Sequence, residues 1–293
     1  MICPGIDPLA AKNRDLSLHE TVDILCRAAL IPCPGPTVQG PYHALARRAL
    51  PDGTFAPANV GEDIGLLSRP IVTQISRWDR LKGFLPLLRG FVRLKQAGPL
   101  APESTNASER RRLDLVRLVL AGPDPIGVAD DPEAADVLNE ILAEYASLHR
   151  ALQDDIALIV LPMESVEENA LMVNALQRAS TIAIQNSLRE GFGLTIAEAM
   201  WKRIPVLSNS RACGPRQQVR DGVDGRLVRD PENVEELERA IREMLAAPDR
   251  LVQMGRAGQR RVHDGLLVLA QLRSWGRLLG ATLEARLLTG PPV

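Results

Sequence analysis

Short, continuously apolar segments alternate with longer amphipathic segments over most of the chain after residue 70. The apolar segments have the length of strands buried on both faces and lie at 71–75, 116–121, 156–161, 181–185 and 205–208, with a shorter candidate at 226–228. The amphipathic segments predict helices at 82–95, 133–149, 166–179, 194–202, 233–246, 248–262 and 265–288. Strands and helices in this alternation form βαβ units, so we expect an α/β fold with a parallel sheet covered by helices on both faces.

The first 70 residues follow a different pattern. Ser17 and Glu20 have the spacing of a capping box and predict a helix within residues 1–27. Over residues 28–69, prolines recur with scattered glycines and little apolar periodicity, which is typical of a long loop or an insertion.

Composition narrows the functional classes. The chain has 35 Lys and Arg against 36 Asp and Glu, and only 3% aromatic residues, which argues against a nucleic-acid partner. No apolar run approaches the roughly 20 residues that cross a bilayer, and the N-terminus lacks the pattern of a secretory signal. The cysteines and histidines show no zinc-site spacing, and no phosphate-loop or GxGxxG motif occurs. We therefore expect a cytoplasmic protein with no membrane partner.

The first candidate binding loop follows the strand at 71–75. Ligands of open α/β sheets bind at the carboxyl ends of the strands, so the segments that follow strands are the ones to search. In SRWDRLKG (76–83), Arg77 and Lys82 place two cations beside the start of a helix, an arrangement suited to a diphosphate. An ordinary charged loop fits these residues equally well when they are taken alone.

The second candidate is REGFGLTIAEAM (189–200), which follows another predicted strand. Gly191 and Gly193 permit a tight turn and a close approach of the backbone to a ligand. The helix that begins near Leu194 points its unpaired amides at whatever precedes it, which favours an anionic phosphate.

Two carboxylates accompany this second loop. Glu190 and Glu198 each suit a pair of hydroxyl groups, as on a sugar ring or a ribose. The apolar neighbours of Glu198 predict that its side chain is buried and needs partners. Asn174 and Gln177, on the preceding helix, either contact the ligand or simply cap and face the surface, and their spacing favours the second interpretation.

These residues carry a resemblance to a known family. The segment EGFGLTIAE resembles the EX7E signature of retaining GT-B glycosyltransferases of family 4. Residues 174–207 resemble, more specifically, trehalose synthases of the glycosyltransferring type, which join a nucleotide-activated glucose to free glucose. Further matches are the SRxDxxKG loop at 76–83, the segment entering the second domain at 6–13 and a DGxxG turn at 221–225. The resemblance covers roughly residues 1–25 and 70–285.

The resemblance implies a domain organisation. It makes the chain the C-terminal, donor-binding half of a GT-B fold, with a remnant of the interdomain segment at 1–27 and a Pro-rich loop or insertion at 28–69. A Rossmann-like nucleotide-sugar-binding domain is expected at 70–264, followed by the crossing helix and tail at 265–293. The acceptor half is expected elsewhere, as a separate acceptor domain or within a homo-oligomer.

The resemblance also implies roles for individual residues. Arg77 and Lys82 would neutralise the donor diphosphate, Glu198 would bind ribose hydroxyls, and Glu190 would contact the transferred glucose near its reacting carbon. The remaining donor-binding positions form one loop and helix start: Gly191, Phe192, Gly193, Leu194 and Thr195, of which the last three would hold the distal phosphate through backbone amides. Side-chain cations and the helix dipole would replace a metal, so neither a metal nor another cofactor is expected.

The predicted function is retaining transfer of glucose from a nucleoside-diphosphate glucose to a sugar acceptor, expected to be glucose. Two alternatives stay open: a non-catalytic nucleotide-sugar-binding fragment, and a family 4 glycosyltransferase with another acceptor. Residues 211–215 replace a turn that is often Gly-Gly in such proteins, which predicts a bulkier loop near the sugar. The isolated chain is expected not to make trehalose, and the apolar stripe of the last helix is expected to be partly exposed.

Overall fold

A single mixed sheet organises the protein. The computed structural model describes residues 3–31, 45–56, 69–97, 107–125 and 133–289. In these residues eight strands form one sheet in the order β2-β1-β5-β4-β3-β6-β7-β8. Their bounds are β1 (Arg47–Ala49), β2 (Phe55–Ala56), β3 (Ile71–Ile75), β4 (Arg117–Pro123), β5 (Ile156–Leu161), β6 (Ile182–Ile184), β7 (Val206–Asn209) and β8 (Gly225–Val228). All neighbours from β5 to β8 pair in parallel, and β1 pairs antiparallel with β5 and with β2.

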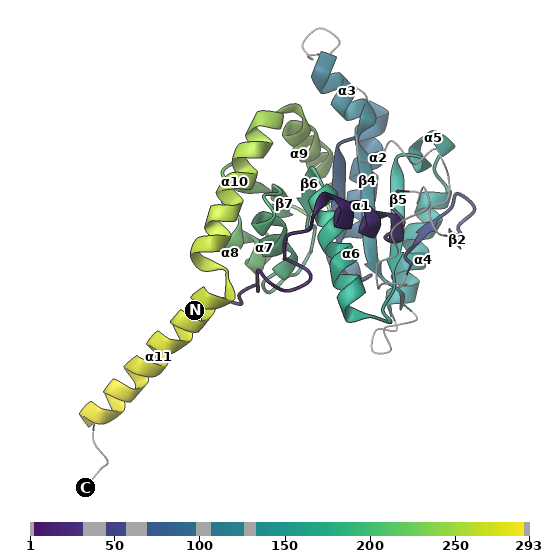
Figure 1. Ribbon diagram of the computed structural model, residues 1–293. Helices are drawn as coiled ribbons and strands as arrows, with labels where there is room; N and C mark the ends of the chain where they lie inside the picture. The colour runs from purple at the N-terminus through teal and green to yellow at the C-terminus, as the bar shows by residue number, and fades with distance from the viewer. Residues whose placement is uncertain (1–2, 32–44, 57–68, 98–106, 126–132, 290–293) are drawn as a thin grey trace.

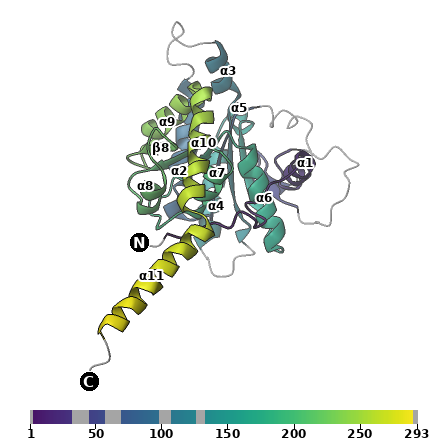
Figure 2. The same ribbon diagram turned by 60° about the vertical axis from the view of Figure 1, so that its left-hand side comes forward.

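Helices cover both faces of the sheet (Figures 1 and 2). Side chains of α2 (Phe84–Ala97), α4 (Glu133–Ala146) and α9 (Val234–Ala246) pack on one face with Val72 of β3. Side chains of α1 (Leu18–Arg27) and α6 (Val166–Ala179) pack on the other face with Ile71 and Ile75, because successive residues of a strand point to opposite faces. Next to them on this second face lie α7 (Leu194–Trp201) and α10 (Pro248–Gly265). The expected α/β fold with both faces covered is confirmed.

Several predicted elements are reproduced closely. The strands predicted at 71–75 and 156–161 and the helix predicted at 166–179 have the observed bounds of β3, β5 and α6. The capping box that was predicted from Ser17 and Glu20 is also present, with both of its hydrogen bonds, at the start of α1.

Other elements differ from the sequence prediction. The short strands β1 and β2 lie within the Pro-rich segment, for which a loop was expected, while residues 32–44 and 57–68 of that segment lie outside the described residues. The helices α3 (Ala107–Leu115), α5 (Arg150–Gln153) and α8 (Cys213–Gln218) were not expected as separate elements. Strands of two or three residues and helices of four or six are too short to show a period, and α3 is strongly polar.

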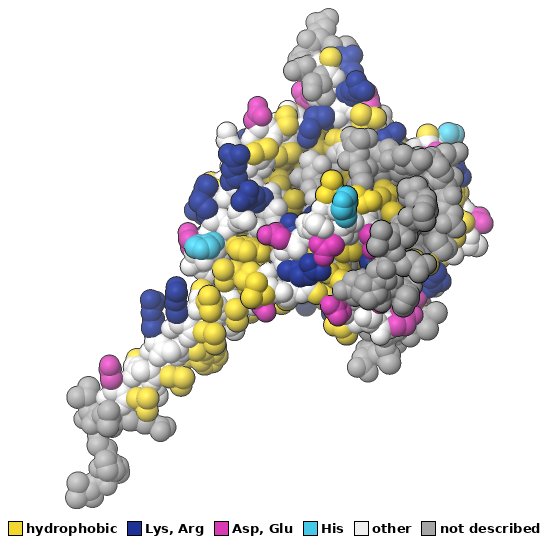
Figure 3. Space-filling view, viewed as in Figure 1, with side chains coloured by type: hydrophobic (Ala, Val, Ile, Leu, Met, Phe, Trp, Pro, Cys, Tyr) yellow, Lys and Arg dark blue, Asp and Glu magenta, His cyan; other side chains and the backbone are white. Residues whose placement is uncertain are grey.

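The last helix, α11 (Val268–Thr289), extends away from the body of the protein, as both ribbon views show (Figures 1 and 2). Apolar side chains lie along this helix and are exposed to the solvent (Figure 3). They include Leu269, Leu272, Trp275, Leu278, Leu279 and Leu283, which are each between 46% and 62% exposed. The predicted exposure of this stripe is thus confirmed for the chain as described. No helix in the described ranges is both long enough and apolar enough to cross a membrane.

Close packing of α10 on α7 fixes the helix that carries Glu198. A Cβ atom added to Gly255 of α10 would lie 2.0 Å from the carbonyl oxygen of Arg203, just beyond α7. Gly258 lies against the side chain of Met200 in the same way, with its nearest contact at 3.3 Å. The two helices can approach so closely because these positions have no side chain.

We expect the substitution Gly255→Ala to lower the free energy of unfolding by about 1–3 kcal/mol, since the added methyl group forces the helices apart. Gly276→Ala is the matched control, because its added Cβ atom meets no atom within 4 Å on α11. The control should be neutral or stabilising by up to about 1 kcal/mol through helix propensity. Urea denaturation of both variants tests the difference, and equal midpoints would contradict the close-packing argument.

Candidate functional site

A cleft of about 530 Å³ lies at the carboxyl ends of the central strands. Its floor includes Ile75 and Ser76 at the end of β3, Gly122 and Pro123 of β4, and Leu161 of β5. The sheet order places β4 on one side of β3 and β6 on the other, so the cleft opens where the strand order changes direction. Eight of the nine predicted site residues line it: Arg77, Lys82, Glu190, Phe192, Gly193, Leu194, Thr195 and Glu198, whereas Gly191 is not part of its wall.

Buried amide groups tie together the two loops that were predicted to bind the ligand. Gln74 of β3 donates to the carbonyl of Lys82 at 2.8 Å and accepts from the amide of Asn186 at 2.9 Å. The Asn186 side chain in turn donates to the carbonyl of Gly83 at 3.0 Å. Gly83 has a φ of +61°, and a Cβ atom there would lie 2.3 Å from the Asn186 carbonyl. The loops after β3 and β6 therefore form one unit.

This unit holds Lys82 against Glu190. The Lys82 Nζ atom lies 2.7 Å from Glu190 Oε2, and both side chains are only about one-sixth exposed, at 15% and 16%. Ser187 donates a longer hydrogen bond of 3.4 Å to the same carboxylate oxygen. Arg77 lies at the mouth of the cleft with its side chain 60% exposed and its guanidinium 3.6 Å from Asp79. Of the two predicted cations of the cleft, Lys82 is thus firmly held and Arg77 is exposed.

The start of α7 forms the wall opposite these cations. Gly193 occupies the N-cap position with a φ of +83°, and no side chain caps the helix. The first amides of α7 therefore lack the side-chain acceptor that a capped helix has. Thr195 donates from its hydroxyl to Gln185 Oε1 at 2.7 Å, and Gln218 donates to the carbonyls of Phe192 and Gly193, which fixes the turn.

Glu198 is buried at the inner end of the cleft, as its apolar neighbours predicted. Its side chain is 6% exposed, and Oε1 lies 3.5 Å from the Nζ atom of Lys12. Its other oxygen, Oε2, is buried and has no hydrogen-bond partner among the described residues, and the same holds for the hydroxyl of Ser76. Buried polar atoms without partners are costly, so both oxygens are available to the polar groups of a ligand.

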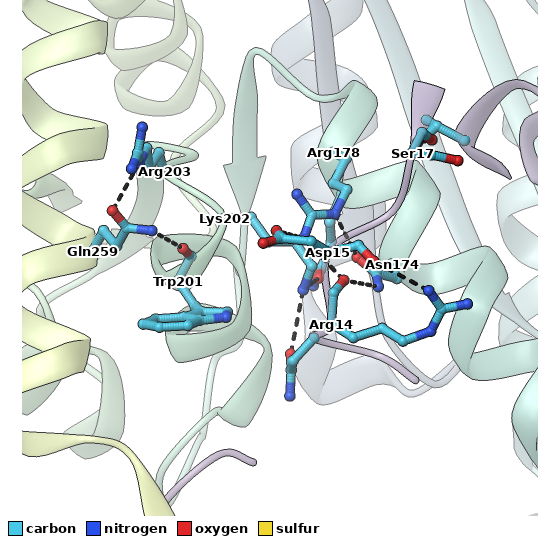
Figure 4. Close-up of polar contacts among 12 residues, drawn as sticks. Arg14, Asp15, Ser17, Asn174, Arg178, Trp201, Lys202, Arg203 and Gln259 are labelled. Carbon is cyan, nitrogen blue, oxygen red and sulfur yellow. Dashed lines mark hydrogen bonds and ion pairs between the residues drawn. The ribbon is translucent and has the colours of Figure 1, made fainter. Parts of the chain in front are cut away.

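Lys202 is the residue that caps the C-terminal end of α7, four positions after Glu198 (Figure 4). Its Nζ atom donates to Gln177 Oε1 at 2.7 Å, to the carbonyl of Glu198 at 3.2 Å and to Asn13 Oδ1 at 3.3 Å. Burial lowers the pKa of this amine to about 7, and the positive charges of Arg178 and Lys12 act in the same direction, while Glu198 opposes the shift.

The sequence interpretation of Asn174 and Gln177 was wrong. Both side chains are buried, at 0% and 3% exposure, so neither faces the surface. Asn174 donates to the carbonyls of Ala11 and Arg14, and Gln177 accepts from Lys202. Neither residue lines the cleft; Asn174 connects α6 to the N-terminal segment, and Gln177 connects α6 to Lys202.

The cleft is also lined by polar residues that had not been predicted as site residues, namely Lys12, Ser76, Asn169 and Gln185. Lys12 is far from the other site residues in sequence, and only its place in the resembling segment 6–13 pointed to it.

The segment 211–215 leads into α8, where Gly214 packs on Phe192 so closely that an added Cβ atom would lie 2.1 Å from the Phe192 carbonyl. Within the described ranges, His, Cys, Asp and Glu side chains form no group of three or more that could hold a metal ion.

The shifted pKa of Lys202 gives a stability prediction. Between pH 7 and the ordinary lysine value of 10.5, the unfolded chain holds this proton and the folded chain does not. The free energy of unfolding therefore gains a positive contribution from Lys202 as pH rises through this window, and the contribution is absent below it. We expect Lys202→Met to flatten this part of the stability profile, measured by urea denaturation from pH 6.5 to 10. Lys95→Met, which removes a lysine paired with Asp155, should keep the Lys202 slope, and an unchanged profile in Lys202→Met would contradict the assignment.

Comparison with known proteins identifies the family. A family model described as glycosyl transferases group 1 matches residues 66–261, which is more than half of the chain. Trehalose synthase from Thermococcus litoralis is 28% identical over 278 residues, which cover 95% of this chain and 52% of that protein. The chain therefore spans about half the length of the curated relatives it matches.

Solved structures agree in fold. Sucrose-phosphate synthase from Thermosynechococcus elongatus superposes with a TM-score of 0.56 and 22% identity, covering 75% of this chain and 47% of that one. Anabaena Alr3699/HepE in complex with UDP-glucose gives a TM-score of 0.54 and 18% identity, over 74% and 50% of the two chains. These likenesses confirm the expected glycosyltransferase fold of the GT-B kind, and with the family match they show that the chain belongs to the group 1 glycosyl transferases.

Proposed function

We propose that this chain binds the donor in a retaining glucosyl transfer of the trehalose synthase type, from a nucleoside-diphosphate glucose to glucose. Similarity to trehalose synthases over 95% of the chain supports the reaction type. The observation that carries the donor assignment is the cleft itself. It joins two cations, an uncapped helix N-terminus and two carboxylates at the point where the strand order changes direction.

The diphosphate of the donor is placed between the loop after β3 and the start of α7. Lys82 has three N–H donors and gives one to Glu190, which leaves two for phosphate oxygens. Arg77 lies at the mouth of the cleft, where its side chain is 60% exposed and its guanidinium is 3.6 Å from Asp79, and in this pose it contacts the same diphosphate. The amides of Gly193, Leu194 and Thr195 face the distal phosphate in this pose, aided by the helix dipole.

The two carboxylates divide the hydroxyl groups of the donor between them. Glu198, with its unpartnered Oε2 atom, accepts hydrogen bonds from the ribose at the inner end. Glu190 lies beside Lys82 and accepts from the hydroxyls of the transferred glucose, close to the bond that breaks. As that bond breaks, negative charge develops on the leaving diphosphate, where Lys82 and Arg77 stabilise it.

A hydroxyl oxygen of the acceptor bonds to the reacting carbon on the face from which the diphosphate departs, and the hydroxyl proton passes to the departing diphosphate oxygen. The configuration at the reacting carbon is therefore retained. The chain's contribution is to fix the donor and to stabilise the leaving group. We assign it only the donor side of the reaction. We also propose that the cations and the helix dipole make a metal ion unnecessary for donor binding.

Replacement of Lys82 tests the donor site directly. We expect Lys82→Met to weaken donor binding by roughly 100-fold, because a buried charge-assisted contact to phosphate is lost. Arg80→Met is the matched control, since Arg80 is a neighbouring cation that pairs with Glu140 outside the cleft. Calorimetric titration with UDP, ADP, GDP and their glucose conjugates measures the affinities and identifies the nucleobase.

Three outcomes would contradict the donor-site assignment. Wild-type chain that binds none of these nucleotides would overturn the proposed function. Equal affinity in the wild type, in Lys82→Met and in Glu198→Ala would instead show that the ligand binds outside this cleft. Loss of binding in Arg80→Met to the same extent would point to a general effect of loop charge.

Metal independence is tested in the same titration. We expect the donor affinity to change by less than about twofold between buffers that contain EDTA and buffers that contain millimolar Mg²⁺. In this proposal the side-chain cations and the helix amides balance the negative charge of the phosphates. Removal of metal ions should therefore leave the donor affinity unchanged. An affinity that appears only with Mg²⁺ would contradict it.

A further inference from the structure

Residues 3–16, called the N-terminal strap from here on, are attached to the second face of the sheet at both ends. Ile6 exchanges two backbone hydrogen bonds of 2.9 Å with the segment that joins α10 to α11. Towards the other end, Asn174 of α6 donates to the carbonyls of Ala11 and Arg14 at 2.8 and 2.9 Å (Figure 4). Because both ends are anchored, the middle of the strap has little freedom to leave the cleft.

Lys202 holds the middle of the strap in place through a hydrogen bond. Its three N–H groups meet three acceptors that belong to three different segments: Asn13 of the strap, Gln177 of α6 and the Glu198 carbonyl of α7. In its protonated form, which predominates below the lowered pKa of about 7, Lys202 has three N–H donors, so the set is complete. Asn13 cannot easily turn its amide over, because its Nδ2 atom already donates to the carbonyl of Asp7 at 2.9 Å. Lys202 therefore fixes both the strap and its distance from α7.

The residue next to Asn13 is the one that reaches into the cleft. Lys12 lines it, and its Nζ atom lies 3.5 Å from Glu198 Oε1. The Lys12 side chain is 36% exposed, whereas that of Glu198 is 6% exposed. A ligand group that binds Glu198 in this cleft therefore lies close to the Lys12 ammonium. The unpartnered Oε2 atom of Glu198 is a second sign that a ligand completes this end of the cleft.

We propose that the strap forms the ribose-side wall of the donor cleft, where Lys12 is a further donor-contacting cation and Lys202 is the buried positioning residue that holds it there. This inference rests on the proposed function, because it assigns the strap to the same donor. Lys12 orients the Glu198 carboxylate toward the hydroxyls of the ribose and offers its remaining N–H groups to the oxygens of the nucleotide. Lys202 contacts no ligand and acts through Asn13.

The first test removes the Lys12 charge in the full chain and uses UDP-glucose and ADP-glucose as probes. We expect Lys12→Met, which keeps an unbranched apolar stem, to weaken binding of the preferred probe about tenfold or more. Arg14→Met is the matched control on the same strap, since the Arg14 guanidinium pairs with Glu20 outside the cleft. The control should bind within about twofold of the wild type.

The second test separates positioning from general stability. Lys202→Met should weaken donor binding. Adding Lys12→Met to this variant should weaken binding only slightly further, because Lys202→Met already leaves the strap without the contact that holds Lys12 in the cleft. Amide hydrogen exchange of residues 3–16 should also speed up in Lys202→Met, while exchange in α2 stays unchanged. Should Lys202→Met fail to fold, Asn13→Ala removes the strap's acceptor, together with the hydrogen bond that Asn13 donates to the Asp7 carbonyl, and should give the same two results.

The outcomes distinguish this inference from the proposed function. Wild-type binding that is lost in Lys82→Met but kept in Lys12→Met would overturn the inference and leave the donor site standing. Fully additive losses in the double variant would overturn the positioning role of Lys202. A wild-type chain that binds neither probe would overturn the proposed function and the role of Lys12 with it.

Discussion

The parallel pairing of β3 with β4 on one side and with β6 on the other is the constraint on which the site depends. Residues 71–75 pair in register with 117–121, and Val72 and Thr73 pair with Ile182 and Ala183. Parallel strands end at the same edge of a sheet, so this pairing alone brings the loops after β3 and β6 together. The two loops are far apart in the sequence, so interactions between sequence neighbours cannot bring them together.

Polar residues inside the central strand make that contact specific. Gln74 is fully buried, yet both ends of its amide are satisfied by the two loops that carry Lys82 and Glu190. A buried amide without partners would cost free energy, so the core residue and the loops stabilise each other only in one arrangement. The distance between the Lys82 ammonium and the Glu190 carboxylate follows from this network.

The sequence predicted those parts of the structure that depend on local pattern. Strands β3 and β5 and helix α6 were predicted with their observed bounds, because apolar periodicity and length are strong there. The strands β1 and β2 were missed, since pairing at a sheet edge can order a few residues without any apolar run. Tertiary contact, in this case with β5, decides their structure.

The residues of the candidate site also differ in how well the sequence predicted their positions. Arg77, Lys82 and Glu190 belong to loops whose position after a strand could be predicted, and the structure places all three around one cleft. Asn174, Gln177 and Lys202 could not be interpreted in this way, because each is polar on a helix and the sequence does not show which face is covered. The partners of Asn174 lie in the N-terminal segment, more than 150 positions away. Lys202 joins Gln177 to Asn13 of the same segment.

The two lysine–glutamate pairs have a consequence for how the cleft responds to ionic strength. In the cleft as described, Lys82 already has Glu190 as counter-ion and Lys12 has Glu198. Added salt weakens these internal pairs as well as the attraction for a charged ligand, so the two effects partly cancel. A pocket of unpaired cations would lose affinity steeply as salt is added. In the proposed donor pose each lysine keeps its carboxylate, so we expect the affinity to fall less steeply as salt is added.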